Sequence, residues 1–203
     1  MTAVKTQFSL EPWDRDRRLH ELGLDLNPLL NIIRQVIAAG AEATPDHAVN
    51  AEGTYRYQAG VVGLRRAFKR DKWVKDRENN IEAIRNDDLK IKIAFTNVDL
   101  ACKNEHEPQP RSKKGKGAEQ SCSNKTPFFP GVSWEKPQDE TWRTFYLMVD
   151  KKGAAELSQP IVSEDTFTGF IERIFLLDTS DHNPTVPDGN EPPIILDPQV
   201  SRK

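Results

Sequence analysis

A strict alternation of apolar and polar side chains between residues 89 and 96 constrains the fold of this chain more than any other feature. The apolar positions are Leu89, Ile91, Ile93 and Phe95, and the positions between them are Lys90, Lys92, Ala94 and Thr96. Successive side chains of a strand point to opposite faces, so this period of two predicts a half-buried β-strand. The preceding residues 80–85, followed by the turn-forming Asn86-Asp87-Asp88, are its expected partner.

The later part of the chain predicts a second hairpin and a short helix. Residues 141–149 (TWRTFYLMV) are rich in aromatic and β-branched side chains, residues 150–153 suit a turn, and residues 154–158 suit a returning strand. Residues 165–174 then carry Phe167, Phe170, Ile171 and Ile174. We interpret this spacing as a short helix that runs into a last strand over residues 173–177.

Two helices are expected before the first strand. Asn27 is a good N-cap and Pro28 suits the first turn, and apolar residues then recur until Gly40. Thr54 is the expected cap of a second helix, whose apolar face repeats at intervals of three and four residues up to Phe68. Helices followed by hairpins indicate an α+β fold: N-terminal helices, an antiparallel sheet of about four to five strands, and one helix in the C-terminal half.

The chain therefore divides into three predicted parts. Residues 1–11 form a flexible N-terminus, residues 12–178 form a single α+β domain, and residues 179–203 form a flexible, acidic, proline-rich tail. Within the domain, residues 97–140 show little periodicity and contain scattered prolines. A loop of this length inside a compact domain is commonly functional or disordered.

Composition and cysteine content indicate the cellular compartment in which the protein is expected. Apolar residues make up 36 % of the 203 residues and charged residues 30 %, which is polar for a globular protein. The N-terminal sequence lacks the apolar run of a signal peptide, and no segment approaches the about 18 apolar residues of a membrane span. With two cysteines, Cys102 and Cys122, we expect a cytoplasmic protein with reduced thiols and no membrane contact.

Several familiar enzyme motifs are absent from the sequence. It has no G-x-x-x-x-G-K-[ST], G-x-G-x-x-G, H-E-x-x-H or G-x-S-x-G pattern. The segment Gly115-Lys116-Gly117 has neither the spacing nor the hydroxyl residue of a phosphate-binding P-loop. Nucleoside triphosphate hydrolysis, dinucleotide oxidoreduction and serine hydrolysis by these routes are therefore not expected, and no cofactor is predicted.

Basic residues suggest a surface that contacts nucleic acid. The formal net charge is −2, but residues 65–77 hold seven basic side chains against two acidic ones, and a second basic cluster follows in the long loop. Lysine and arginine at this density supply the salt-sensitive part of nucleic-acid affinity. The predicted contact residues are Arg65, Arg66, Lys69, Arg70, Lys113, Lys114 and Lys116. Ordinary solvation of these charges is the competing interpretation.

Two alternatives involve chemistry in the long loop. Asp99 and Glu105 follow the strongest strand, and carboxylates at a strand end followed by lysines are typical of a metal-dependent nuclease. Separately, Cys102, His106 and Cys122 form a weak candidate zinc site, which lacks a fourth ligand nearby. Solvated charges and buried thiols are the simpler interpretations of these residues.

The acidic tail carries one apolar run, formed by Ile194, Ile195 and Leu196. Apolar residues within a disordered segment often dock onto a partner. A third hypothesis is therefore a protein-interaction module, for example a defence or counter-defence factor, that binds another protein through this run.

Four further stretches carry a resemblance to a known family. They are Asn97-x-Asp99-x-Ala101-Cys102, Lys114-Gly115, Ala155-Glu156-Leu157-Ser158 and Phe170-Ile171-Glu172-Arg173-Ile174-Phe175. Over residues 54–177 the chain resembles a family of bacterial proteins, without an assigned activity, that are often carried on plasmids and integrated elements. The resemblance implies a mobile-element context, in which DNA handling is common, and implies no catalytic residue. We therefore expect a non-enzymatic binding or adaptor protein that contacts nucleic acid or a nucleic-acid-associated protein.

Overall fold

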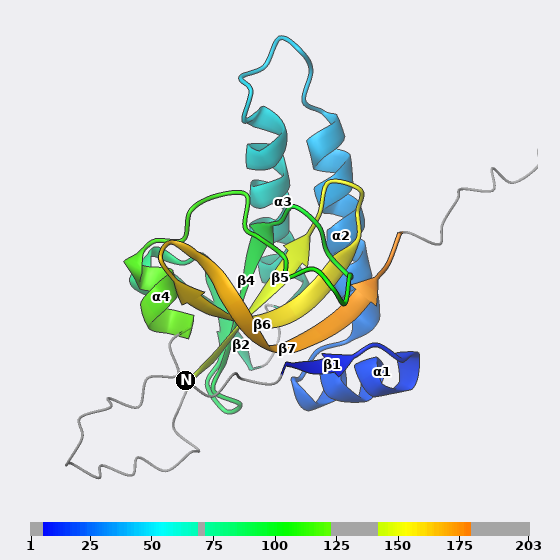
Figure 1. Cartoon of the computed structure of the whole chain (residues 1–203), viewed down its shortest axis with the longest axis vertical. Coiled ribbons are helices and arrows are strands. Elements are labelled where there is room, and N and C mark those ends of the chain that lie inside the picture. Colours follow the sequence, from blue (N-terminus) through cyan, green and yellow to red (C-terminus); the bar gives the residue numbers. More distant parts are fainter. Residues whose placement is uncertain (1–5, 69–71, 123–141, 180–203) are drawn as a thin grey trace, which may run out of the picture.

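A computed structural model of the chain describes residues 6–68, 72–122 and 142–179 (Figure 1). In chain order its elements are β1 (Gln7–Ser9), α1 (Pro12–Glu21), α2 (Leu26–Ala41), α3 (Ala51–Phe68), β2 (Trp73–Asp76), the 3-10 turn η1 (Glu78–Asn80), β3 (Ala83–Asn86), β4 (Ile91–Asn97), α4 (Lys116–Cys122), β5 (Arg143–Val149), β6 (Ala155–Ser163) and β7 (Thr166–Leu177). No helix in these ranges is both long and apolar enough to cross a membrane.

The strands form one mixed sheet of seven in the order β1-β7-β6-β5-β4-β3-β2. Strand β4 is parallel to β5 and β1 is parallel to β7, whereas the other neighbours are antiparallel. The expected combination of helices with a sheet is confirmed. The prediction of an antiparallel sheet of four to five strands was wrong, because the sheet has seven strands and two parallel pairs. Parallel neighbours need a crossover connection, and here the segment between β4 and β5 supplies it.

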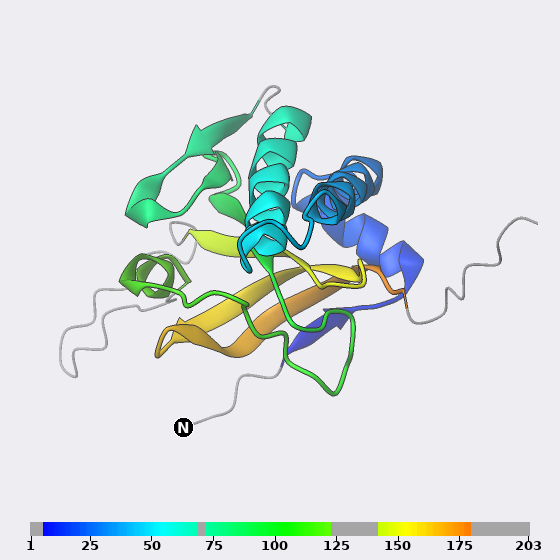
Figure 2. The ribbon, with the colours of Figure 1, turned by 90° about the horizontal axis from the view of Figure 1, so that it is seen from above.

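The sheet is covered on both faces, so the molecule has two cores. Helices α1, α2 and α3 lie over one face, and the segment 98–115 with α4 lies over the other (Figure 2). Within β5, Phe145 and Leu147 pack beneath the helices, whereas Tyr146 and Met148 pack beneath α4 and the loop. This alternation is the period of two of a strand, with an apolar partner on each side.

Strand β4 is consequently buried along almost its whole length, and not on one face as expected. Every residue from Ile91 to Thr96 is buried. Lys92, which a half-buried strand would present to solvent, is 7 % exposed, and its ammonium lies 3.1 Å from a carboxylate oxygen of Asp76 and also contacts Glu78. A lysine is tolerated at such a position because carboxylates accompany it.

The helix predicted over residues 165–174 is instead the first part of strand β7. The pairing of β7 with β6 shifts register at three places, so that Phe167 pairs with Val162, Gly169 with Ile161, and Phe170 with Pro160. An extra residue in a strand moves the following side chains to the other face. Phe167 and Phe170 therefore share one core although they lie three residues apart, a spacing that imitates a helix.

The N-terminal part also differs in its boundaries. The second predicted helix begins at Ala51 and not at Thr54, and Gly40 lies inside α2 and does not end it. Residues 7–9, expected to belong to a flexible terminus, form β1 at one edge of the sheet. Helix α1 was not predicted, because its apolar residues are too few to form a clear stripe.

The long segment 97–140 is partly regular. Val98 and Pro110 form an antiparallel bridge, and residues 116–122 form α4. The remainder of the predicted loop from residue 123, and the predicted tail beyond residue 179, lie outside the described residues.

Two glycines of α3 give a test of the packing of this helix on β4. A Cβ at Gly60 would lie 2.3 to 2.6 Å from three ring atoms of Phe95, whereas a Cβ at Gly53 would meet no heavy atom within 4 Å. Overpacking of a core costs about 1–3 kcal/mol, and alanine gains back about 1 kcal/mol of helix propensity. We expect Gly60→Ala to lower the free energy of unfolding, by up to about 2 kcal/mol, in urea denaturation.

Gly53→Ala is the matched control, since it makes the same change in the same helix without a steric conflict. It should leave the free energy of unfolding unchanged or raise it. Equal effects of the two substitutions would contradict the close packing of α3 against Phe95.

Candidate anion-binding pocket

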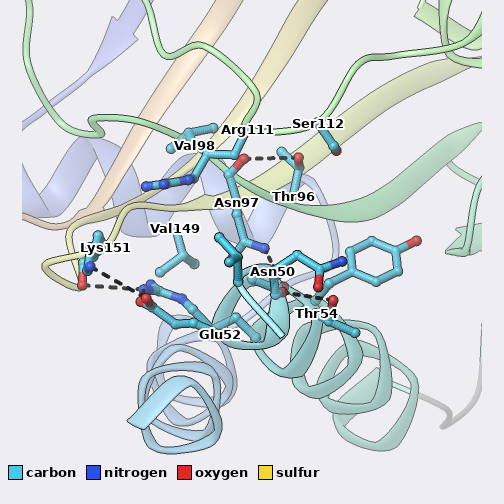
Figure 3. Close-up of a pocket in the computed structure, with 14 residues that line it drawn as sticks. Asn50, Glu52, Thr54, Thr96, Asn97, Val98, Arg111, Ser112, Val149 and Lys151 are labelled. Carbon is cyan, nitrogen blue, oxygen red and sulfur yellow. Dashed lines mark hydrogen bonds and ion pairs between the residues drawn. The ribbon is translucent and has the colours of Figure 1, made fainter. Parts of the chain in front are cut away.

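A cavity of about 530 Å³ lies where strands β4 and β5 end and helix α3 begins (Figure 3). Asn97 and Val149, the last residues of the two strands, form one wall, and residues 49–57 form another. Because β4 and β5 are parallel, their carboxyl ends meet at this edge of the sheet. The crevice outside the carboxyl ends of parallel strands is a common place for a ligand in α/β sheets.

The first turn of α3 contributes Glu52, Gly53 and Thr54 to the lining of the cavity. The N–H groups of Ala51 and Thr54 donate to the carbonyl oxygens of Ala48 and Asn50. Those of Glu52 and Gly53 have no acceptor within the described ranges. The start of an 18-residue helix carries a partial positive charge, and such free N–H groups are suited to an anion.

Arg56 lies in the wall of the cavity and is 5 % exposed. Its guanidinium donates to the main-chain oxygens of Asp150 and Lys151, the latter at 3.3 Å, and pairs with Glu52 at 3.4 Å. Its Nε is buried without a hydrogen-bond partner. Gly40 of α2 makes room for this side chain, since a Cβ there would lie 2.7 Å from the Cγ of Arg56.

Two more cations lie at the mouth of the cavity. Arg111 extends from the loop segment, and Lys151 extends from the turn between β5 and β6 (Figure 3). Burial lowers the pKa of Arg56, and the nearby positive charge of Arg111 lowers it further, against the opposing effect of Glu52. Of the residues that line the cavity, Arg56, Arg111 and Lys151 are cationic and Glu52 alone is anionic.

Asn97 adds an unsatisfied acceptor. Its side-chain Nδ2 donates to the carbonyl oxygen of Gly53 at 2.9 Å, while its Oδ1 is buried without a partner. An unpaired buried polar atom costs about 1–3 kcal/mol, and because protein atoms enclose this oxygen it is not open to a ligand. What the lining offers to an anion is therefore its three cations, together with the first turn of α3.

The segment that carries Arg111 is held on the sheet by a buried ion pair. Arg173 of β7 and Glu156 of β6 are 1 % and 0 % exposed, and two hydrogen bonds of 2.9 and 2.7 Å join them. The same Arg173 donates to the main-chain oxygens of Lys103 and His106, and Glu156 accepts from the N–H of Cys102 at 2.8 Å. The segment is thus bonded to the centre of the sheet through charged groups.

The basic residues predicted to bind nucleic acid do not form one surface. Arg65 pairs with Glu82, and Arg66 is exposed near the end of α3; Lys69 and Arg70 lie outside the described residues. Lys113 and Lys116 are exposed near α4, over the opposite face of the sheet. Lys114 is turned inward, and its ammonium donates to the hydroxyl of Thr96 at 2.7 Å.

The predicted nuclease carboxylates are not brought together. Asp99 accepts from the N–H groups of Leu100 and Gln109 and lies 3.0 Å from His106, an arrangement that braces a turn. Burial opposes its ionisation, but these hydrogen bonds outweigh burial and lower its pKa. Glu105 is exposed, and the described residues contain no group of three or more His, Cys, Asp or Glu side chains that could hold a metal ion.

The cysteines of the weak zinc candidate are both free and buried, and they have different surroundings. The thiol of Cys102 donates to the carbonyl oxygen of Ala155 at 3.0 Å, whereas Cys122 neighbours Tyr146 and Lys114. Burial raises the pKa of each thiol to about 12, and His106 is instead placed beside Asp99. The predicted tail contact of residues 194–196 lies outside the described residues.

Arg56 and Lys151 were not among the predicted binding residues, because those residues were chosen from dense clusters of basic side chains in the sequence. Arg56 stands four residues before Gly60 and eight before Leu64, so it begins a row of α3 that is otherwise apolar and buried. A charged residue on a buried row was the available signal, because it must find partners inside the fold. Lys151 lies in a predicted turn and gave no such signal.

The buried ion pair yields a stability prediction. Glu156→Gln removes the negative charge and leaves the Arg173 cation buried, which costs about 3–5 kcal/mol in comparable pairs. We expect a loss of this size in the free energy of unfolding from urea denaturation. We also expect faster amide hydrogen exchange at residues 102–106.

Asp88→Asn makes the same change of carboxylate to amide in the exposed pair of Asp88 with Lys72, and it should leave the unfolding midpoint unchanged. A Glu156→Gln protein as stable as the parent would show that the pair does not anchor the segment.

Comparisons of the chain with protein-family models, with curated proteins and with solved structures found no match. Function is therefore inferred from the pocket itself, and the family resemblance of the sequence stays a prediction.

Proposed function

We propose that the protein is a non-enzymatic binding protein that takes a phosphate group of a nucleotide or of a nucleic-acid end into the cavity between α3 and β4. The expected contact with nucleic acid is kept, but the proposed contact residues are different. They are Arg56, Arg111, Lys151 and the first turn of α3, in place of the dispersed basic residues of the sequence analysis.

The observation that supports this proposal is the convergence of three cations at one helix start. Two guanidinium groups, those of Arg56 and Arg111, lie close enough for one to affect the pKa of the other, and Glu52 is the single carboxylate in the lining. Like charges held together repel, and a bound anion relieves this repulsion. A helix N-terminus with free N–H groups adds to the attraction.

Phosphate suits this arrangement better than a carboxylate does. Guanidinium groups bind phosphate oxygens with two parallel hydrogen bonds, and phosphate has enough oxygens for both the arginine and the helix N–H groups. Each charge-assisted hydrogen bond contributes about 1.5–3 kcal/mol. Arg111 is exposed and can form such bonds, whereas Arg56, whose terminal nitrogens already donate to main-chain carbonyls and Glu52, adds a fixed positive charge.

The rest of the cavity suits the sugar and base of a nucleotide. Its volume of about 530 Å³ is within the usual range for small-molecule sites. Val49, which is fully exposed at the rim, and Tyr57 in the wall offer apolar surface to a base.

Binding without catalysis fits the same residues. The lining supplies cations, amides and hydroxyls that hold an anion, while its carboxylate, Glu52, is engaged by Arg56 at 3.4 Å and Lys151 at 3.5 Å. A general base needs a carboxylate that is free to take a proton. The resemblance of the sequence implies a mobile-element context, which agrees with a nucleic-acid ligand. That context is proposed from the resemblance alone.

Binding of short single-stranded oligonucleotides tests the proposal, measured by fluorescence anisotropy at low and moderate salt. We expect an oligonucleotide with a 5′-phosphate to bind about tenfold more tightly than the same strand without it, which corresponds to about 1.4 kcal/mol. Arg111→Gln should remove most of that difference. Adenosine monophosphate and inorganic phosphate, added as competitors, separate recognition of a nucleotide from recognition of phosphate alone.

The double variant Lys113→Gln/Lys116→Gln is the matched control, since it removes two exposed positive charges that lie outside the cavity. It should reduce salt-dependent affinity slightly and keep the preference for the 5′-phosphate. If this control loses binding while Arg111→Gln keeps it, the loop surface is the site. If no oligonucleotide, nucleotide or phosphate binds at low salt, the proposed function is wrong.

A further inference from the structure

Lys114 has an unusual environment for a lysine. Its ammonium donates to Thr96 Oγ1 at 2.7 Å and lies 5.2 Å from the ring centre of Tyr146 and 5.5 Å from that of Phe167. No carboxylate of the described residues acts on the charge of its ammonium, and the neighbouring thiol of Cys122, whose pKa burial raises to about 12, is neutral where Lys114 titrates. Lys92, the other enclosed lysine of this face, has two carboxylate partners.

Two effects compete for the charge of Lys114. Burial disfavours the cation and can lower a lysine pKa by up to about 3–5 units, whereas the faces of two aromatic rings favour it. A cation–π contact is worth about 0.5–2 kcal/mol, and one pKa unit is 1.36 kcal/mol, so the rings recover only part of the effect of burial. Desolvation therefore prevails and lowers the pKa of Lys114 to about 8.

The backbone holds this amine at a fixed place. The N–H of Lys114 donates to the carbonyl oxygen of Asp165 at 2.7 Å, in the turn between β6 and β7. Thr96, which accepts from the ammonium, also lines the cavity described above. Lys114 as a whole is partly exposed.

We propose that Lys114 is a reactive amine that captures a small aldehyde or ketone as an imine. This is an activity beyond phosphate binding, and it does not depend on the proposed function. The geometry that carries it is an amine held by one hydroxyl and two aromatic rings, with no carboxylate partner among residues 6–68, 72–122 and 142–179. Desolvation of a lysine in an apolar setting is a recognised way to produce a nucleophilic amine.

The reaction is balanced with groups that are present. The ammonium releases one proton to solvent, and the neutral nitrogen uses its lone pair to form a bond to the carbonyl carbon. Transfer of a proton from nitrogen to the carbonyl oxygen gives a carbinolamine, which loses water to form the imine. Donation of one N–H to Thr96 Oγ1 would leave the lone pair of the neutral amine free to attack.

Reductive alkylation of the folded protein with propanal and cyanoborohydride tests this, because the reductant fixes an imine as a stable secondary amine. The extent at each lysine is measured by peptide mass spectrometry. Lys113 and Lys116 are exposed neighbours in the same loop and serve as internal controls, so no variant is needed. At pH 7 we expect Lys114 to react at least tenfold faster than either neighbour, since more of it is neutral.

The pH dependence gives a second criterion. Above its pKa of about 8 the neutral fraction of Lys114 stops rising, whereas that of an ordinary lysine rises until about pH 10.4. The ratio of Lys114 to Lys113 labelling should therefore fall between pH 7 and pH 10. In urea above the unfolding transition the three lysines should react alike.

Two results would overturn the proposal. One is a Lys114 rate at pH 7 no greater than those of Lys113 and Lys116. The other is a rate that increases with low concentrations of urea in proportion to the unfolded fraction, which would place the reaction in the unfolded chain. Since the probe carries no phosphate, neither result bears on the phosphate pocket.

Discussion

The buried pair of Glu156 and Arg173 is the interaction on which one whole face of the molecule depends. The two charges are almost fully buried, and beyond their mutual bonds they bind the backbone at Cys102, Lys103 and His106, while Glu156 also accepts from the hydroxyl of Ser158. A buried ion pair gains little over apolar packing, but it is specific, because either charge alone would be costly. The pair therefore fixes where the segment after β4 lies.

The position of that segment determines what its basic residues can do. Arg111 is placed by a hydrogen bond of its N–H to the carbonyl oxygen of Asn97 and reaches the cavity, whereas Lys114, three residues later, turns between Thr96 and the β6–β7 turn. Lys113 and Lys116 remain exposed. Four cations that are neighbours in sequence thus have three different environments, and only one of the four lines the pocket.

This divergence explains which parts of the protein could be predicted. The two long helices and strand β4 follow from local periodicity, and their predicted boundaries lie close to those observed. The first part of strand β7 was mistaken for a helix because bulges place Phe167 and Phe170 on one face, and a bulge is decided by the partner strand β6, whereas residues 173–177 were expected as a strand. The parallel pairing of β4 with β5 likewise depends on a crossover that no local pattern indicates.

The candidate site was harder to predict for the same reason. Density of charge in a sequence counts Arg65 as a binding residue, but after folding Arg65 is paired with Glu82, while the isolated Arg56 lines the cavity. Its place depends on Gly40 of another helix and on carbonyl oxygens of the turn at Asp150 and Lys151. What sets Arg56 apart is that it lines the cavity together with Arg111 and Lys151, three cations beside the single carboxylate of Glu52, and the fold decides such a grouping for each residue separately.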